Sequence, residues 1–142
     1  MEFFASVPVT LTVETLQRRL GIDQLPGWCA SIDKVLESRN EKGAIYCIWG
    51  EFRIRREVIR DGLRFTLPGC PNALQWTVTA ENGEVVVHLT INRQRHDADF
   101  IESIEQFVGD WKSGIVSAVG KDAPSGPSCR NGRCTDSFSG FG

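Results

Sequence analysis

The residues best suited to chemistry are two cysteines near the C-terminus, in the segment CRNGRC from Cys129 to Cys134. Asn-Gly at its centre favours a two-residue hairpin turn, which places Cys129 opposite Cys134 at a Cα separation that a disulfide accepts. Arg130 and Arg133 beside them should favour the thiolate form. We therefore expect an oxidisable pair that could exchange with a partner's disulfide or bind a soft metal such as zinc or copper.

Two other interpretations of this segment remain open. Zinc knuckles and thioredoxin-like motifs separate their cysteines by two residues rather than four, so the pair could have no role. Alternatively, the chain is the precursor of a modified peptide, in which a folded leader presents the C-terminal segment to modifying enzymes and cleavage follows near Gly120. The modifiable residues would then be Ser128, Cys129, Cys134, Thr135, Ser137 and Ser139.

The remaining cysteines favour packing over reactivity. Cys29 and Cys47 lie in apolar stretches, where a thiol behaves as a small hydrophobic group. Cys70 lies in a loop between Gly69 and Pro71 and is the candidate for an exposed thiol. The sequence contains no nucleophile elbow, phosphate loop, dinucleotide fingerprint or zinc-protease motif, so we predict no catalytic residues and no enzymatic activity.

Composition limits the classes of partner. The 142 residues carry a net charge of −2, with 41% hydrophobic and 24% charged residues, which is typical of one globular domain and gives no reason to expect nucleic acid. No apolar run approaches the roughly 18 residues of a membrane span, and the N-terminus lacks the basic flank of a signal peptide. Five unevenly spaced cysteines favour a reducing, cytoplasmic environment. A basic cluster could attract an anion or simply form a solvated face; it comprises Arg53, Arg55, Arg56, Arg60 and Arg64.

The clearest structural pattern predicts a β-hairpin over residues 74–91. Apolar residues alternate with polar ones on both sides of Asn82-Gly83, a dipeptide that prefers a type I′ turn. With that turn, Trp76 faces Leu89 and every apolar residue meets another on one side of the ribbon. Turn chemistry and hydrophobic alternation thus predict the same register.

Further strands and helices are expected before this hairpin. Residues 3–11 predict a strand, and Thr12 can cap a short helix over 13–20. A second helix is expected after Pro26, because the apolar residues that follow repeat at helical spacing; they are Trp28, Ile32, Val35 and Leu36. From Ala44 the pattern alternates with period two, which predicts a long strand bent at Gly50 and a hairpin turn at Asp61-Gly62.

An amphipathic helix is expected after Asp97 or Asp99, either of which can cap it. Its apolar stripe comprises Phe100, Ile104, Phe107, Val108, Trp111 and Ile115. Such a stripe needs a sheet face to cover. We therefore predict an α+β domain over residues 1–120, with an antiparallel sheet of four to five strands, two tight-turn hairpins, two short N-terminal helices and a long covering helix. Residues 121–142, rich in Gly, Ser, Pro and Cys, are expected to form a flexible tail.

Aromatic residues are numerous enough to line an apolar pocket between sheet and helix, although core packing is the preferred explanation for them. The pocket candidates are Trp49, Phe52, Phe65, Trp76 and Trp111. The predicted element order over residues 3–119 resembles the helix-grip arrangement of small lipid- and polyketide-binding domains. The resemblance implies a small apolar ligand held between sheet and helix.

The sequence favours a non-enzymatic accessory protein that binds another protein through its C-terminal tail or the exposed sheet face. Neither nucleic acid nor a membrane is expected as a partner, and a homodimer is left open. The peptide precursor and the apolar-ligand domain are the alternatives. A metal site other than the cysteine pair stays unknown.

Overall fold

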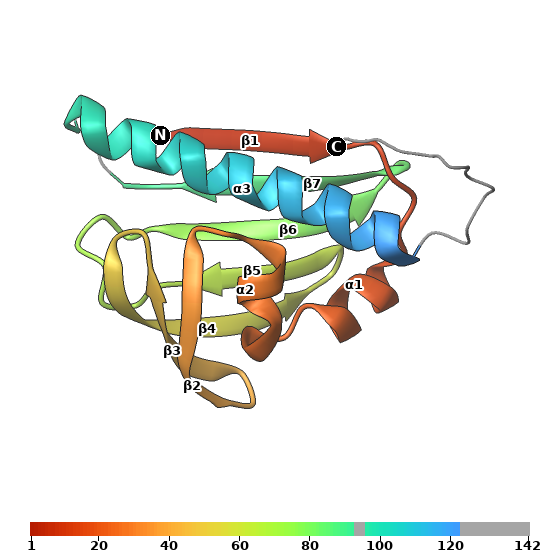
Figure 1. Ribbon diagram of the computed structural model, residues 1–142, viewed down its shortest axis with the longest axis horizontal. Coiled ribbons are helices and arrows are strands. Elements are labelled where there is room, and N and C mark those ends of the chain that lie inside the picture. The colour runs from red at the N-terminus through yellow and green to blue at the C-terminus, as the bar shows by residue number, and fades with distance from the viewer. Residues whose placement is uncertain (93–95, 123–142) are drawn as a thin grey trace.

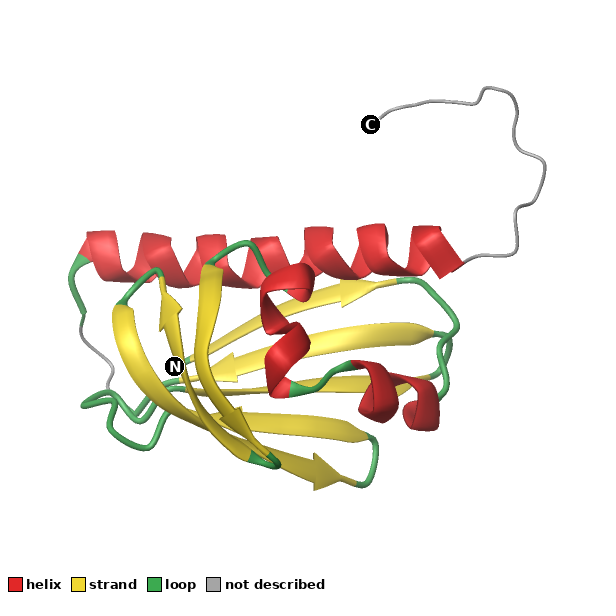
Figure 2. Ribbon diagram, turned by 60° about the horizontal axis from the view of Figure 1, so that its bottom comes forward, coloured by secondary structure: helices red, strands yellow, loops and turns green. Residues whose placement is uncertain are grey.

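The computed structural model describes residues 1–92 and 96–122, and within them one antiparallel sheet carries all three α-helices on the same side (Figures 1 and 2). The seven strands are β1 (Glu2–Val7), β2 (Ile32–Arg39), β3 (Lys42–Cys47), β4 (Gly50–Ile59), β5 (Gly62–Thr66), β6 (Gln75–Glu81) and β7 (Glu84–Thr90). The helices are α1 (Val13–Arg19), α2 (Leu25–Trp28) and α3 (Ala98–Asp122), with a 3₁₀ turn at Ile22–Gln24. The sheet order is β1-β7-β6-β5-β4-β3-β2, so the N-terminal strand β1 forms one edge of the sheet and β2 forms the other. An α+β fold with an antiparallel sheet and a covering C-terminal helix is confirmed.

The central hairpin has the expected register. Trp76 pairs with Leu89, and Thr77 pairs with His88 on the opposite face. Asn82 and Gly83 have φ values of 54° and 77°, as a type I′ turn requires. Local turn preference and hydrophobic alternation agree here, and for that reason the sequence alone was sufficient.

The second helix is where the prediction was wrong. It comprises only α2, and residues Ile32–Arg39 form strand β2. Register shifts interrupt β2 between Ile32 and Lys34 and again between Val35 and Glu37, so the four residues from Ile32 to Val35 lie opposite only three residues of β3. A bulge of this kind places apolar residues three apart on one face of a strand and thereby imitates helical spacing.

The long strand expected from Ala44 is two strands. β3 and β4 form a hairpin whose turn contains Ile48 and Trp49, and Gly50 has a φ of 110°. Because Ile45 pairs with Phe52, both point to the covered face, while Tyr46 is exposed. The reassigned β2 and this division together explain why seven strands replace the expected four to five.

The turn expected at Asp61-Gly62 lies one residue earlier. Ile59 pairs with Gly62 and Val58 with Leu63, so Arg60 and Asp61 form the loop. Gly62 belongs to β5, where a Cβ would lie 2.0 Å from the carbonyl oxygen of Val78 on β6. The glycine is required by this close approach of strands rather than by the turn.

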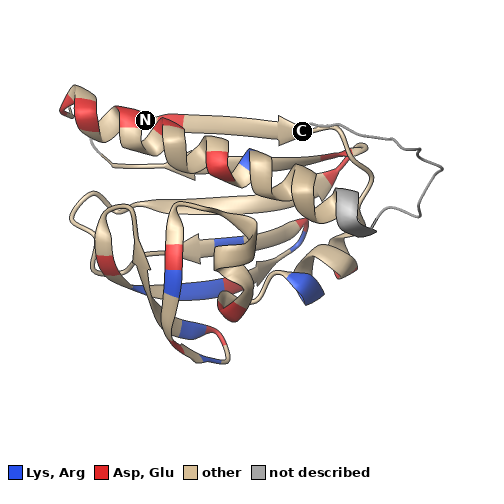
Figure 3. Cartoon of the chain, viewed as in Figure 1, with Lys and Arg blue, Asp and Glu red and all other residues tan. Residues whose placement is uncertain are grey.

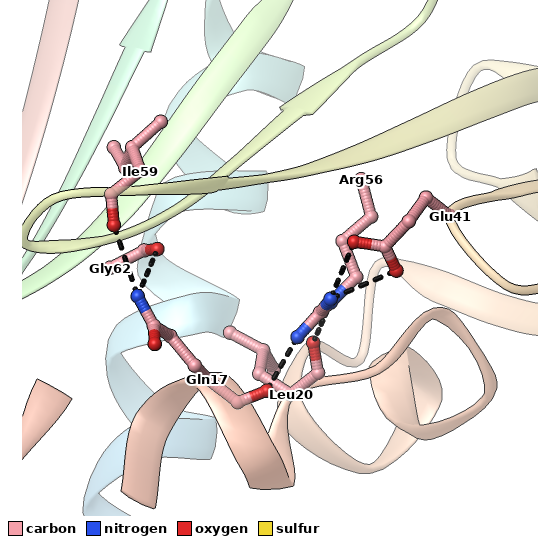
Figure 4. A network of polar contacts seen from close by, with 6 residues as sticks. All are labelled: Gln17, Leu20, Glu41, Arg56, Ile59 and Gly62. Atoms are coloured by element: carbon pink, nitrogen blue, oxygen red, sulfur yellow. Dashed lines mark hydrogen bonds and ion pairs between the residues drawn. The ribbon is translucent and has the colours of Figure 1, made fainter. Parts of the chain in front are cut away.

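Polar contacts attach α1 to the sheet (Figure 4). The guanidinium of Arg56 donates to the carbonyl oxygens of Gln17 and Leu20 at the end of α1, and forms an ion pair of 2.8 Å with Glu41. The side-chain amide of Gln17 donates to the carbonyl oxygens of Ile59 and Gly62 at 3.0 and 3.1 Å. Otherwise unpaired carbonyls at the helix end are thus satisfied by a strand residue.

Helix α3 covers the sheet with the expected stripe. Its residues Ile104, Phe107, Val108, Trp111 and Ile115 are buried, and Phe100 is half-buried. The helix continues to Asp122, and the tail beyond it lies outside the described residues. No helix in the described ranges has both the length and the apolar character needed to cross a membrane.

Candidate functional site

An aromatic cluster fills the space between the sheet and α3. Phe65 and Trp76 come from β5 and β6, and Phe107 and Trp111 face them from α3; each is at most 1% exposed. The ring centroid of Trp76 lies 5.4 Å from that of Phe65, 5.0 Å from that of Phe107 and 6.3 Å from that of Trp111. Direct pairing of Phe65 with Trp76 across β5 and β6 sets this geometry.

Two polar atoms inside this cluster lack a partner. The indole Nε1 atoms of Trp76 and Trp111 are both buried and make no hydrogen bond within the described part of the chain. A buried donor left unpaired costs about 1–3 kcal/mol, so most buried indoles find an acceptor. The site therefore holds two N–H donors, one from the sheet and one from the helix, in apolar surroundings.

Trp49 connects this interior to the surface. It lies in the β3–β4 turn, half-buried, and its indole Nε1 donates to Ser103 Oγ of α3 at 2.8 Å. Ser103 Oγ in turn donates to the carbonyl oxygen of Phe100 at 2.6 Å. The Trp49 ring centroid lies 4.8 Å from that of Phe107, which itself contacts Trp76. Aromatic rings thus continue from the β3–β4 turn to the two unpaired indoles.

Four of the five pocket candidates are brought together in this way, but Phe52 is not. Phe52 packs against the core from β4 and makes no ring contact with another described aromatic residue. Sequence reasoning placed Phe107 only in the helix stripe, although it is the ring that joins Trp49 to Trp76. Ser103 was also missed, because a single serine on a helix gives no signal before its tertiary neighbour is known.

The thiols of Cys29 and Cys47 are buried and protected rather than reactive. Burial raises the pKa of Cys29 to about 12, and the Cys29 thiol donates to the carbonyl oxygen of Phe107 at 3.7 Å. Burial also raises the pKa of Cys47, whose thiol donates to the carbonyl oxygen of Gly50 at 3.4 Å. Thiols of this kind remain protonated at neutral pH and are poor nucleophiles. Cys70 is a free, half-buried thiol packed against the core.

Other polar side chains form separate small contacts. Ser31 donates to Asp110 Oδ2 at 2.5 Å, which ties the start of β2 to α3. On the uncovered sheet face, His88 stacks on Phe4 at 4.3 Å and lies 2.7 Å from Glu2 Oε1. The described residues contain no group of three His, Cys, Asp or Glu side chains placed to hold a metal. Cys129, Arg130, Arg133 and Cys134 lie outside the described residues, so the tail hypothesis remains a prediction.

Comparison with known proteins finds similarity of fold alone. No family model and no curated protein matches the chain. An uncharacterised protein from Bacillus thuringiensis matches with a TM-score of 0.58 at 14% identity, covering 83% of this chain and 98% of that one. A START superfamily protein from Mycobacterium smegmatis matches with a TM-score of 0.57 at 11% identity, covering 85% and 95%. At these identities the likeness establishes a shared fold.

Proposed function

We propose that this domain binds a small, neutral, apolar ligand that carries an oxygen acceptor, held between the sheet and α3. The observation that carries the proposal is the pair of unpaired indole N–H groups of Trp76 and Trp111 within an otherwise apolar cluster. One carbonyl oxygen has two lone pairs and can accept from both donors. The shared fold with a START superfamily protein and the resemblance to helix-grip domains give independent support.

The surroundings favour a neutral ligand over a carboxylate. Among the described residues, the buried set is hydrophobic apart from Ser31, and it contains no cation. An ionised group enters such a site only at a large free-energy cost unless a charge compensates it. A ketone, ester or alcohol would meet the two donors without that cost, whereas a pure hydrocarbon would leave them unpaired.

Entry of the ligand requires the cluster to open. The rings are in contact, so a ligand has to displace part of their packing, and α3 supplies two of the four rings. The hydrogen bond between Trp49 and Ser103 joins the β3–β4 turn to α3 beside these rings. Opening would have to break this hydrogen bond and also separate the Trp49 ring from Phe100 and Phe107 of α3.

A pair of isosteric probes tests the proposal. Acetophenone and α-methylstyrene have nearly the same shape, but only acetophenone has a carbonyl oxygen. We expect acetophenone to bind at least about tenfold more tightly, since two hydrogen bonds distinguish the probes. The measurement is titration of the full chain, followed by tryptophan fluorescence and by the NMR resonances of the indole N–H groups. Failure of both probes to bind would refute the proposal.

Matched variants identify the donors. Trp76→Phe and Trp111→Phe remove one N–H each while keeping a ring, and each should reduce the preference for acetophenone. Trp28→Phe is the control, because Trp28 is a buried tryptophan on α2 whose ring packs beside Arg19 rather than in the cluster. Equal preference in the Trp28 and Trp76 variants would contradict the assignment of the donor.

The hypotheses that concern the tail stay separate predictions. A redox or metal-binding arm, a modified-peptide precursor and a protein partner or homodimer all depend on residues or surfaces that this ligand site does not involve. Thiol titration with mass measurement before and after reduction tests whether Cys129 and Cys134 pair. Two free thiols under oxidising conditions would rule out the redox version.

A further inference from the structure

Four cations lie together on the face of the sheet opposite α3. Arg39 on β2 pairs with Lys42 on β3, and Lys42 pairs with Arg55 on β4. Paired residues point to the same face, and Arg53 joins them because it precedes Arg55 by two positions. Neighbouring strands are about 4.8 Å apart, so Arg39, Lys42 and Arg55 fall within roughly 10 Å. We call Arg39, Lys42, Arg53 and Arg55 the cation row.

The charges of the cation row are not neutralised by the protein. None of the four forms an ion pair or side-chain hydrogen bond within the described part of the chain. Two other basic residues nearby are neutralised: Arg56 by Glu41, and Arg64 by Glu57 at 3.2 Å. Like charges directly opposite each other on adjacent strands are destabilising. The row is therefore a concentration of positive charge, and a bound anion would reduce the repulsion among its four side chains.

A hollow lies among these side chains. It has a volume of about 190 Å³ and is lined by Lys42, Arg53, Ile54, Arg55 and Pro68. A neighbouring hollow of about 480 Å³ shares Lys42 and Arg53 and extends to Arg39, and its remaining lining residues are Glu37, Asn40 and Glu41. Both exceed the size of one phosphate group, and together their linings include all four residues of the cation row.

We infer that the cation row is a binding site for a small ligand bearing one or two phosphate groups. The guanidinium fork of Arg matches two phosphate oxygens, and Lys adds a point charge, so Arg53, Arg55 and Lys42 hold the first phosphate. Arg39 is placed to meet a second. The site lies on the opposite face from the aromatic cluster and does not depend on the function proposed for it.

The surrounding charges favour a small ligand over an extended polyanion. Glu37, Glu41 and Glu51 lie on β2, the β2–β3 turn and β4 beside the row, and the whole chain carries −2. Figure 3 shows the longest run of basic positions on β4, with acidic positions nearby and mostly acidic positions on α3. A membrane surface or nucleic acid would meet these carboxylates, whereas a small phosphate fits between them.

Calorimetric titration of the full chain with inorganic pyrophosphate tests the inference. We expect saturable 1:1 binding at about 50 mM salt that weakens at higher salt, as screening of exposed charges requires. The double variant Arg53→Gln/Arg55→Gln should weaken binding at least about tenfold, because it removes charge-assisted hydrogen bonds. Circular dichroism of the variant verifies that the fold is retained, which is expected for two exposed side chains.

The matched control is Arg18→Gln/Arg60→Gln, which changes net charge equally at exposed arginines outside the row. It should alter pyrophosphate affinity less than about twofold. Equal weakening in both double variants would overturn the site in favour of a diffuse charge effect, as would the absence of pyrophosphate binding. Sedimentation with phosphatidylglycerol vesicles distinguishes the source of phosphate: binding to vesicles without binding to pyrophosphate would also overturn the inference.

Discussion

Close packing of α3 on α2 depends on one glycine. A Cβ added at Gly114 would lie 1.8 Å from the carbonyl oxygen of Trp28 and 2.5 Å from its carbonyl carbon. Real Cβ contacts essentially never fall below 3.0 Å, so Gly114→Ala must separate the two helices by roughly 1.2 Å. Both obstructing atoms belong to the backbone, which a side-chain rotation cannot relieve.

The magnitude follows from two opposing effects. Replacement of Gly by Ala within a helix gains about 1 kcal/mol of helix propensity, and overpacking costs typically 1–3 kcal/mol or more. Because both obstructing atoms are backbone, the overpacking cost should be at the upper end, about 3 kcal/mol, so Gly114→Ala should lower the free energy of unfolding by about 2 kcal/mol. Gly109→Ala lies on the same helix with nothing within 4 Å of its added Cβ, so it should stabilise by about 0.5–1 kcal/mol.

Urea unfolding, followed by tryptophan fluorescence, measures both variants, and calorimetry gives their melting temperatures. A difference of about 3 kcal/mol between them corresponds to roughly 10 °C or more for a domain of this size. Because helix propensity is common to both substitutions, the difference reports the contact with Trp28 alone. Equal stability of the two alanine variants would refute the close approach of α2 and α3.

Three further predictions concern stability. Arg56→Met should lower the free energy of unfolding by about 2–3 kcal/mol, since it leaves two carbonyls and Glu41 without their partner. Arg64→Met removes one member of an exposed ion pair and should lower it by less than about 1 kcal/mol. Chemical denaturation measures both losses. Asn82→Val places a β-branched residue at a φ of 54° and should destabilise the hairpin by roughly 1–2 kcal/mol, measured by the melting temperature. The pKa of Cys29 is about 12 in the folded state against 9.0 for an unburied thiol, so the folded state binds the thiol proton more tightly. The free energy of unfolding should therefore be constant below pH 9 and fall by up to about 1.4 kcal/mol per pH unit between pH 9 and 12. Cys29→Ala should flatten this decline, and a slope equal to that of the unaltered chain would contradict it.

Elements whose local signals agree were predictable. The β6–β7 hairpin, the Thr12 cap of α1 and the stripe of α3 all follow from neighbours in sequence, and each is present as expected. Thr12 accepts from the Thr15 amide at 3.1 Å, as its position before an amphipathic segment predicted. In these segments the backbone geometry and the buried face are set within a few residues.

The candidate site was predictable only in part. Burial of Phe65, Trp76 and Trp111 follows from alternation and helical spacing, but their contact depends on how β5, β6 and α3 pack. The lack of an acceptor for Trp76 and Trp111 depends on every residue packed around them, so the spacing of residues along the sequence cannot predict it. Likewise, the basic cluster in the sequence includes Arg56 and Arg64, and only the fold separates these neutralised residues from Arg53 and Arg55.

The sequence by itself determined the α+β class, the register of the β6–β7 hairpin and the amphipathic helix α3 that covers the sheet, because turn residues and periodic apolar residues act over short distances. Tertiary structure decided that Ile32–Arg39 is a strand, since bulges in β2 accommodate helical spacing once β3 provides a partner. It also decided that Lys42 joins Arg53 and Arg55, because side chains 11 and 13 residues apart become neighbours only when β3 and β4 pair. Long-range pairing supplies this information, and no local propensity contains it.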